Sequence, residues 1–250
     1  MLEDEYGWTA EPQFPPLLRG IKVKGHPRPF DLAHRDARDK TAVSGDFYWS
    51  PSPRFLECAL VLEPETHTTR SLHMLFTAMV AFGDSFGALA PPEIGVFYRW
   101  PDLFILNKAI IGAAMIAIPE GVGDDEVPDW LVVGIKIDLK GKENDLNPGA
   151  DMDHTNLFEE GVGDLSHSRL VESFARHFLV WIHTWNEEGF KPVHENWQAR
   201  AEARDKGVSI EQDGRSYAGK YINLDDEGNL LLKTPGGETI SLKVRDFVCS

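Results

Sequence analysis

The sequence predicts an α+β domain followed by a small all-β module. Three observations lead to this prediction. The 250 residues are 42% hydrophobic, with 14 Phe and 7 Trp, which is enough apolar side chain to bury a sizeable core. Up to about residue 205, short β-type runs alternate with segments of helical period. From residue 207 on, about forty residues show only short strand runs separated by turn signals, a pattern typical of a small barrel.

The first domain is expected over residues 1–205 and the second over residues 206–250. Strands are predicted at 17–23, 47–49 and 55–62, and Pro64 ends the third because proline removes a ladder donor. Thr68 and Thr69 can cap a helix whose apolar residues recur at helical spacing and which must end before Pro91. The charged stretch 197–207 is predicted to connect the two domains.

The middle of the chain returns to β-type runs. Four strands are expected at 95–100, 103–106, 109–118 and 130–139, with Asn107-Lys108 as a two-residue hairpin turn. Ser166 can cap a second helix, and Gly189 closes it. In the second domain, five short strands are expected at 208–210, 217–223, 229–233, 239–242 and 246–248.

The charge balance excludes some partners. Lys and Arg total 25 against 40 Asp and Glu, a net charge of −15, which repels nucleic acid and anionic membrane. The longest apolar stretch, Ala109–Ile118, is about half of what spans a bilayer. The first residues are acidic where a signal peptide would be basic, and the two cysteines lie far apart. We therefore expect a soluble, cytoplasmic protein that binds neither nucleic acid nor membrane.

Two short motifs invite functional interpretations that their context does not favour. Gly83-Asp84-Ser85-Phe86-Gly87 matches the nucleophile elbow GxSxG, but it falls in the last turns of a predicted helix instead of between a strand and a helix. The segment from Asp145 to Asn156 begins like a calcium loop but lacks its glycine and terminal glutamate. Both are predicted to be structural.

The segment from Arg99 to Asp138 is the most informative. It contains Arg99-Trp100-Pro101-Asp102, a turn, Lys108 to Gly112, and then Val132-Val133-Gly134-Ile135-Lys136-Ile137-Asp138. In order and spacing it resembles the biotin/lipoate–protein ligase superfamily, whose members carry K-W-P-N-D, K-x-x-G and G-x-G-x-N motifs. Trp49-Ser50-Pro51 occupies the place of the W-x-S-P element of that family. The resemblance covers about residues 43–250.

The resemblance implies a fold and a chemistry. The fold would be a mixed sheet with packed helices followed by an SH3-like barrel. Relatives activate biotin or lipoate with ATP to an acyl-adenylate and pass the acyl group to a lysine of a biotinyl- or lipoyl-type carrier protein. By this resemblance ATP, magnesium held by Asp102, a biotin-like or lipoate-like acid and such a carrier are the expected cofactors and partners. The matching positions expected to bind the substrate or the nucleotide are Trp49, Ser50, Arg99, Trp100, Asp102, Gly112, Gly134 and Asp138.

The sequence also departs from the family pattern. Relatives supply cations from an R-G-R loop and from the lysine of K-x-x-G, whereas residues 41–48 contain no arginine and Ala109 stands at the lysine position. Lys108 is one residue earlier, and one step along a strand points a side chain to the opposite face. Lys136 replaces the second glycine of G-x-G-x-N and shares a strand face with Gly134 and Asp138.

Lys108 and Lys136 are therefore the candidate catalytic residues. Lys136 either faces solvent as an ordinary strand residue or points into the ligand site and restores a lost cation. Three functions remain open: an acyl-adenylate-forming ligase or acyltransferase with a rearranged site, in which standard biotin ligation is not expected, a non-catalytic protein that binds a biotin-like, lipoate-like or other small acid or a carrier domain, and a structural or regulatory scaffold. The sequence predicts neither the acid nor the oligomeric state.

Overall fold

Seven strands form the main sheet in the order β1-β2-β3-β7-β6-β5-β4. The computed structural model describes residues 11–141, 153–163, 165–202, 207–212 and 214–248. The pair β1–β2 is parallel and the other neighbouring pairs are antiparallel, so the sheet is mixed, as predicted. The strands are β1 (Arg19–Lys22), β2 (Asp46–Trp49), β3 (Phe55–Leu62), β4 (Phe97–Arg99), β5 (Leu103–Leu106), β6 (Ala109–Ala117) and β7 (Leu131–Asp138).

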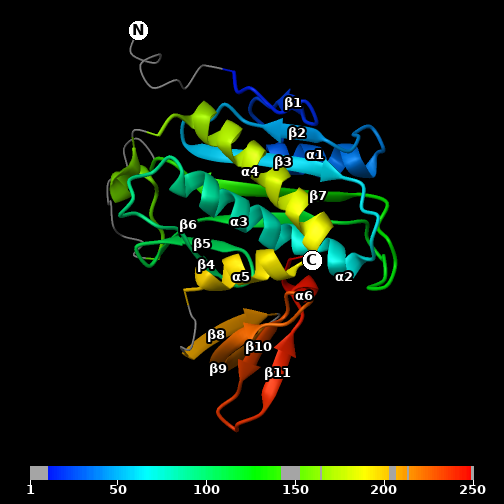
Figure 1. Ribbon diagram of the computed structural model, residues 1–250, viewed down its shortest axis with the longest axis vertical. Helices are drawn as coiled ribbons and strands as arrows, with labels where there is room; N and C mark the ends of the chain where they lie inside the picture. Colours follow the sequence, from blue (N-terminus) through cyan, green and yellow to red (C-terminus); the bar gives the residue numbers. More distant parts are fainter. Residues whose placement is uncertain (1–10, 142–152, 164, 203–206, 213, 249–250) are drawn as a thin grey trace.

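One face of this sheet carries the main core. Alternate residues of β3 and β7 pack there against two long helices, α3 and α4, which cross the sheet in Figure 1. Ser166 caps α4 through its Oγ, and Gly189 ends it with a φ of 76°, both as predicted. The helix predicted from Thr68 is divided at Leu72. The helices and the helical turn on this side and at its edge are α2 (Thr68–Ser71), α3 (His73–Gly87), η1 (Phe158–Val162), α4 (His167–Glu188) and α5 (Lys191–Ala199).

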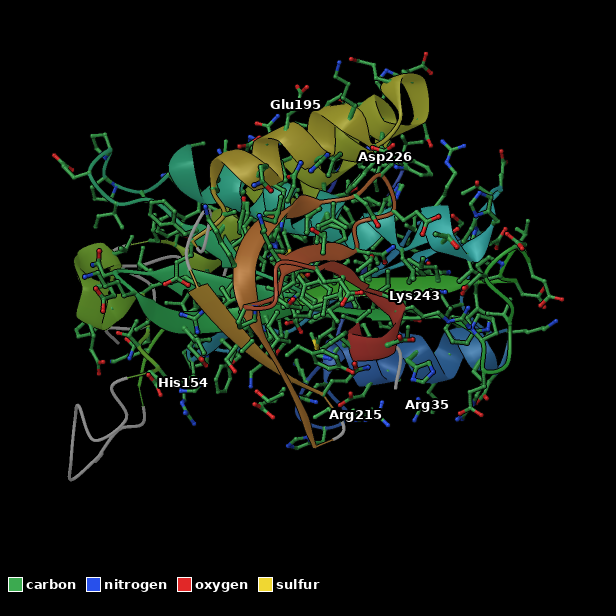
Figure 2. All side chains as sticks on the ribbon, turned by 90° about the horizontal axis from the view of Figure 1, so that it is seen from below. Arg35, His154, Glu195, Arg215, Asp226 and Lys243 are labelled. Atoms are coloured by element: carbon green, nitrogen blue, oxygen red, sulfur yellow. The ribbon has the colours of Figure 1, made fainter. Side chains whose placement is uncertain are left out.

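The opposite face of the sheet carries α1 (Pro29–Arg38), which the sequence analysis did not predict. Pro29 stands in its first turn, where proline is tolerated because that N–H has no partner inside the helix. Ala33 and Ala37 are buried against Ala59 and Val132 of the sheet. Figure 2 shows α1 on one side of the sheet and α4 and α5 on the other. We call the face that carries α1 the α1 face.

The C-terminal module is a four-stranded antiparallel sheet in the order β11-β10-β9-β8, below the main sheet in Figure 1. This is consistent with the SH3-like barrel that the resemblance implies. The fifth strand expected at 246–248 is wrong, because these residues lie in a short helix. Three residues are too few for their period to distinguish a strand from a helical turn. The elements are β8 (Gly207–Gln212), β9 (Arg215–Leu224), β10 (Leu230–Lys233), β11 (Thr239–Leu242) and α6 (Arg245–Val248).

The module is docked on the main domain through specific contacts. The indole N–H of Trp100 donates to the carbonyl of Gly228 at 3.1 Å, and the Trp100 ring meets that of Phe247 edge-on at 4.7 Å. Asp124 accepts hydrogen bonds from Lys243 at 3.2 Å and from Arg245 at 2.5 Å. The domain boundary expected between residues 205 and 206 lies outside the described residues.

Candidate functional site

Gly134, Lys136 and Asp138 lie on the α1 face of β7. A Cβ on Gly134 would lie 2.5 Å from the carbonyl oxygen of Cys58 and 3.1 Å from the ring of Phe30. Glycine therefore lets α1 approach the sheet closely, and the Phe30 ring takes the space above it. Beyond Gly134, toward the end of β7, this strand face belongs to Lys136 and Asp138.

Lys136 stands between β3 and β6, with Glu57 as its partner on one side and Ala113 on the other. The Lys136 side chain is half-buried, and its ammonium lies 4.5 Å from the ring centroid of Phe55. Within the described part of the chain, no carboxylate oxygen lies within 4.0 Å of this ammonium. Phe55 is therefore the group against which the ammonium packs.

Arg54 is a second cation at this place, and the sequence analysis missed it. Its guanidinium carbon lies 4.8 Å from the same Phe55 centroid, and its Nε is buried without a hydrogen-bond partner. Arg54 immediately precedes β3 and comes three residues after Pro51 of the W-x-S-P element. The sequence signal that could have indicated Arg54 is the presence of a cation so soon after this element.

Two carboxylates balance these cations at longer range. Glu57 is buried, and burial raises its pKa, while the charges of Lys136 and Arg28 oppose the shift. Burial also raises the pKa of Asp138, opposed by Lys136, His154 and Arg54 in that order. Figure 2 shows His154 on the same side of the sheet as α1. The site is thus a mixed cluster of two cations and two partly desolvated acids around one aromatic ring.

Asp102 lies on the same side of the sheet but at a separate place. It lines a cavity of about 370 Å³ with Phe30, Met115 and Arg245. Burial raises the pKa of Asp102 to about 6. The neighbouring Leu103 pairs with Ala113, which pairs with Lys136, so Asp102 and Lys136 are two strand spacings apart, about 10 Å.

The described residues offer a magnesium ion one carboxylate at this place. No three His, Cys, Asp or Glu side chains among residues that the structure describes converge as a metal site. Magnesium bound mainly through nucleotide phosphates needs one or two protein carboxylates, and Asp102 can supply one. The residues therefore fit a magnesium–nucleotide complex and not a metal held by protein alone.

Two residues of the segment Arg99-Trp100-Pro101-Asp102 make structural contacts with later parts of the chain. Arg99 pairs with Glu202 at 2.8 Å, and Trp100 is buried and donates to the Gly228 carbonyl. Trp49 is buried in the core on the helix side, where its ring lies 6.4 Å from that of Phe14. The structure does not bring these three side chains together with Lys136.

Ser50 and Gly112 stand next to the cluster through their backbones. The N–H of Ser50 donates to the carbonyl of Glu57 at 3.1 Å. A Cβ on Gly112 would collide with the carbonyl oxygen of Lys136, so only glycine lets β6 approach β7 this closely. Gly112 thus shapes the site without a side chain, and Ser50 fixes the end of β2 against β3 through its backbone.

Lys108 lies in the hairpin turn and is exposed. Asn107 and Lys108 have φ of 48° and 76°, so the predicted two-residue hairpin turn has the two left-handed residues of type I′. Ile105 pairs with Ile110 and Phe104 with Gly112, so Ile111 is the extra residue of a β-bulge, which resets the strand's alternation. The simple alternation expected from Lys108 to Gly112 is therefore wrong. Lys108 is five residues from Ala113, roughly 15 Å along the strand from the row of Lys136.

The remaining motifs are structural or undescribed. Ser85 of the GxSxG match lies within α3, fully buried, and its Oγ has no hydrogen-bond partner. It is not a nucleophile elbow, in agreement with the prediction. Most of the calcium-like segment, residues 145–152, lies outside the described residues. Within the described ranges, no helix is long and apolar enough to cross a membrane.

The comparisons with known proteins agree with this fold. A family model described as the biotin/lipoate A/B protein ligase family matches residues 14–199. The chain belongs to this family. Its resemblance to the superfamily, expected from the motifs, is thereby confirmed.

Two relatives align with most of this chain at low sequence identity. A biotin–[acetyl-CoA-carboxylase] ligase of Paracoccus denitrificans is 24% identical over 183 residues, which are 72% of this chain and 75% of that protein. A bifunctional ligase/repressor of Bacillus spizizenii is 21% identical, covering 83% of this chain and 66% of its own length. Both of these relatives are named as ligases, whereas the corresponding motifs of the present chain are altered.

Solved structures extend the agreement over the C-terminal module. A biotin protein ligase-like protein of unknown function from Silicibacter sp. TM1040 superposes with a TM-score of 0.85 at 32% identity, covering 95% of this chain and 99% of that chain. The biotin protein ligase of Aquifex aeolicus superposes with a TM-score of 0.74 at 15% identity, covering 92% and 96%. The second match shows the fold alone, a mixed sheet with packed helices and a C-terminal all-β module.

Proposed function

We propose that this protein activates a small carboxylic acid with ATP on the α1 face and passes the acyl group to a lysine of a carrier protein. The observation that carries the proposal is the Lys136 ammonium, half-buried on the α1 face and free of an ion pair within 4.0 Å among the described residues. An ammonium in this position can bind a carboxylate or a phosphate. Family membership supplies the reaction class.

The chemistry needs a cation at this place. A carboxylate oxygen of the acid attacks the α-phosphorus of ATP, and pyrophosphate leaves. The acceptor amine then attacks the acyl carbon and AMP leaves. The first step brings two anions together, so a cation between them lowers the barrier. Lys136 takes this role, with Asp138 beside it, while Asp102 would bind magnesium on the nucleotide phosphates.

The acid is proposed to be biotin-like or lipoate-like but not biotin. A solved complex of the Aquifex aeolicus ligase contains biotin and ATP, which supports both ligand classes for this family. Residues 41–48 of the present chain contain no arginine, and Ala109 stands at the family lysine position. Phe30 also takes the space above Gly134. A different acid, held by Lys136, accounts for these changes.

The cell compartment and the partner follow from this proposal. Acyl activation with ATP fits the cytoplasm, and the buried Cys58 is a free thiol, as expected in a reducing compartment. The acceptor is proposed to be a biotinyl- or lipoyl-type carrier protein. The net charge of −15 gives nucleic acid no attraction to this surface.

A non-catalytic protein that holds a small acid or a carrier domain is the second candidate. In such a protein Arg99 and Trp100 would serve the fold alone, through their contacts with Glu202 and Gly228. Such a protein would bind the acid without consuming ATP. The two candidates predict the same ligand and differ in turnover.

ATP–pyrophosphate exchange tests the proposal directly. Purified protein is incubated with ATP, magnesium, labelled pyrophosphate and one acid at a time from a panel of biotin, lipoate, octanoate and other short acids. Acyl-adenylate formation is supported if exchange depends on one acid, if Lys136→Gln abolishes that exchange, and if Lys140→Gln leaves it intact. No exchange with any acid, together with calorimetric binding of one of them, would establish the second candidate.

A further inference from the structure

Two cations contact one aromatic ring on the α1 face. The Lys136 ammonium lies 4.5 Å and the Arg54 guanidinium carbon 4.8 Å from the centroid of Phe55. The two charged groups are therefore less than about 10 Å apart. They come from separate parts of the chain: Arg54 immediately precedes β3 and Lys136 lies in β7. The antiparallel pairing of Phe55 with Asp138 brings them together.

Neither cation has its hydrogen-bonding capacity satisfied by the described residues. The Nε of Arg54 is buried and has no partner, although buried donors are nearly always paired in folded proteins. Lys136 has three ammonium protons and no carboxylate within 4.0 Å in the described parts of the chain. A buried guanidinium N–H is costly without an acceptor, so a bound oxyanion would relieve this cost.

The nearby acids surround the two cations without neutralising them by contact. Glu57 and Asp138 interact with Lys136 electrostatically, and Asp138 also with Arg54, but no ion pair forms among them. Arg28 and Asp31 of α1 also interact electrostatically with Glu57, and His154 with Asp138. Both acids are partly desolvated, which favours their neutral forms and leaves the cations in excess when an anion approaches.

We propose that Arg54 and Lys136 together form a clamp, which holds the anionic end of the ligand across the ring of Phe55. This inference rests on the proposed function for the place of the site, and it names its second cation. Arg54, on the loop that enters β3, would thereby supply the arginine that residues 41–48 lack. The ligand class is an oxyanion, either a carboxylate or a phosphate, that a planar guanidinium and an ammonium bind from two sides.

The test is equilibrium binding by calorimetry on the full chain, with inorganic pyrophosphate in one arm and octanoate in the other. Arg54→Gln and Lys136→Gln are compared with two control variants. Arg35→Gln removes an exposed arginine of α1 that pairs with Asp36, and Lys140→Gln removes an exposed lysine that lies 5.5 Å over the ring of Phe158. Thermal unfolding of each variant verifies that it is folded.

Each clamp variant is expected to weaken binding of the preferred oxyanion about 10- to 100-fold, whereas the controls change it less than about 3-fold. Arg54→Lys should recover part of the loss, because charge is kept and the planar fork is lost. The arm with the larger effect identifies the source, phosphate or carboxylate.

The outcomes separate the two proposals. Wild-type affinity in Arg54→Gln, with a loss in Lys136→Gln, would exclude Arg54 from the site. Wild-type affinity in both variants, or no binding of either probe to the native protein, would overturn the clamp. Pyrophosphate binding that needs both cations, without exchange for any acid, would keep the clamp and refute acid activation.

Discussion

Glu57 on β3 and Lys136 on β7 are direct cross-strand partners on the α1 face, yet their charged groups do not form an ion pair within 4.0 Å. The Lys136 ammonium lies over Phe55 instead. The pKa of Glu57 is raised, chiefly by burial. The lysine therefore keeps its charge available for a ligand, and the glutamate opposes an incoming anion only while it is ionised.

This relationship predicts a pH dependence of anion binding. The ordinary pKa of a glutamate is about 4.3, and a raised value means that Glu57 takes up a proton at a higher pH than usual. As pH falls, oxyanion affinity should increase, because Glu57 and Asp138 take up protons at a higher pH than ordinary carboxyl groups and lose negative charge. Glu57→Gln should bind the anion more tightly at pH 8, by about 3- to 10-fold, and show a flatter profile. Calorimetry with octanoate, whose simple carboxylate keeps its charge from pH 8 down to about pH 6, measures both effects.

A Glu57→Gln profile that follows the wild type would show that Glu57 does not act on the ligand. Glu159→Gln, outside the cluster, serves as the control for removing one carboxylate. Its affinity and its pH profile should match the native protein.

Tight binding of biotin should be absent. Relatives use an arginine loop and a lysine at the position of Ala109, and each lost charge-assisted contact costs about 1.5–3 kcal/mol, roughly ten- to a hundredfold in affinity. Phe30 above Gly134 removes further space. Calorimetry with biotin should give micromolar or weaker affinity. A sub-micromolar dissociation constant would contradict this and would mean that other residues rebuild the biotin site.

The buried His73 predicts acid sensitivity of the fold. Burial is the main cause that lowers the pKa of His73 to about 3, and its Nδ1 accepts a hydrogen bond from Trp185. The unfolded chain binds a proton at about pH 6.5 that the folded chain refuses until pH 3, so stability falls as pH decreases through this window. The loss should approach about 1.4 kcal/mol per pH unit below pH 6.

His73→Gln keeps an acceptor for Trp185 and cannot titrate. Urea unfolding at pH 7.5, 6 and 5 should show a shallower loss of stability for this variant. His183→Gln, at an exposed position of α4, should keep the wild-type slope. Equal slopes for all three proteins would mean that other groups, such as the buried His167, whose pKa is lowered to about 4 by burial, dominate the acid response.

Gly228 is predicted to be critical for docking of the C-terminal module. Its φ is 82°, and a Cβ there would collide with the ring of Phe76. Gly237 has nearly the same φ, 87°, but open space around a Cβ. Gly237→Ala should therefore cost about 1 kcal/mol from backbone strain alone, and Gly228→Ala about 1–3 kcal/mol more. Chemical unfolding compares the two, and equal losses would contradict the collision.

The sequence was sufficient for most strands and for the two long helices, because their apolar residues recur with clear periods and their ends carry caps or prolines. It was insufficient for α1. Pro29 favours a loop when the sequence is considered alone, whereas in the structure it stands at the start of the helix. The one-turn α6 was predicted as a strand, since three residues carry no usable period. Both errors occur where only tertiary packing decides the conformation.

The site was predictable in part for a similar reason. Family motifs and strand alternation placed Gly134, Lys136 and Asp138 on one face of β7, where the structure has them. They could not show that Trp49, Arg99 and Trp100 contact the rest of the fold, because motif spacing does not specify side-chain direction. Arg54 lies outside every motif, and only the pairing of β3 with β7 brings Lys136 to Phe55, the chain neighbour of Arg54.

The division of the sheet into two faces has a consequence for how this family diverges. Residues 56, 58 and 60 of β3 belong to the helix-side core, whereas Phe55 and Glu57 look toward α1. Substitutions on one face leave the packing of the other untouched, so their effects on folding free energy should add. The residues of the α1 face, which are every second residue along each strand, can therefore change during evolution while the helix-side core stays constant. Active and inactive members can share one core.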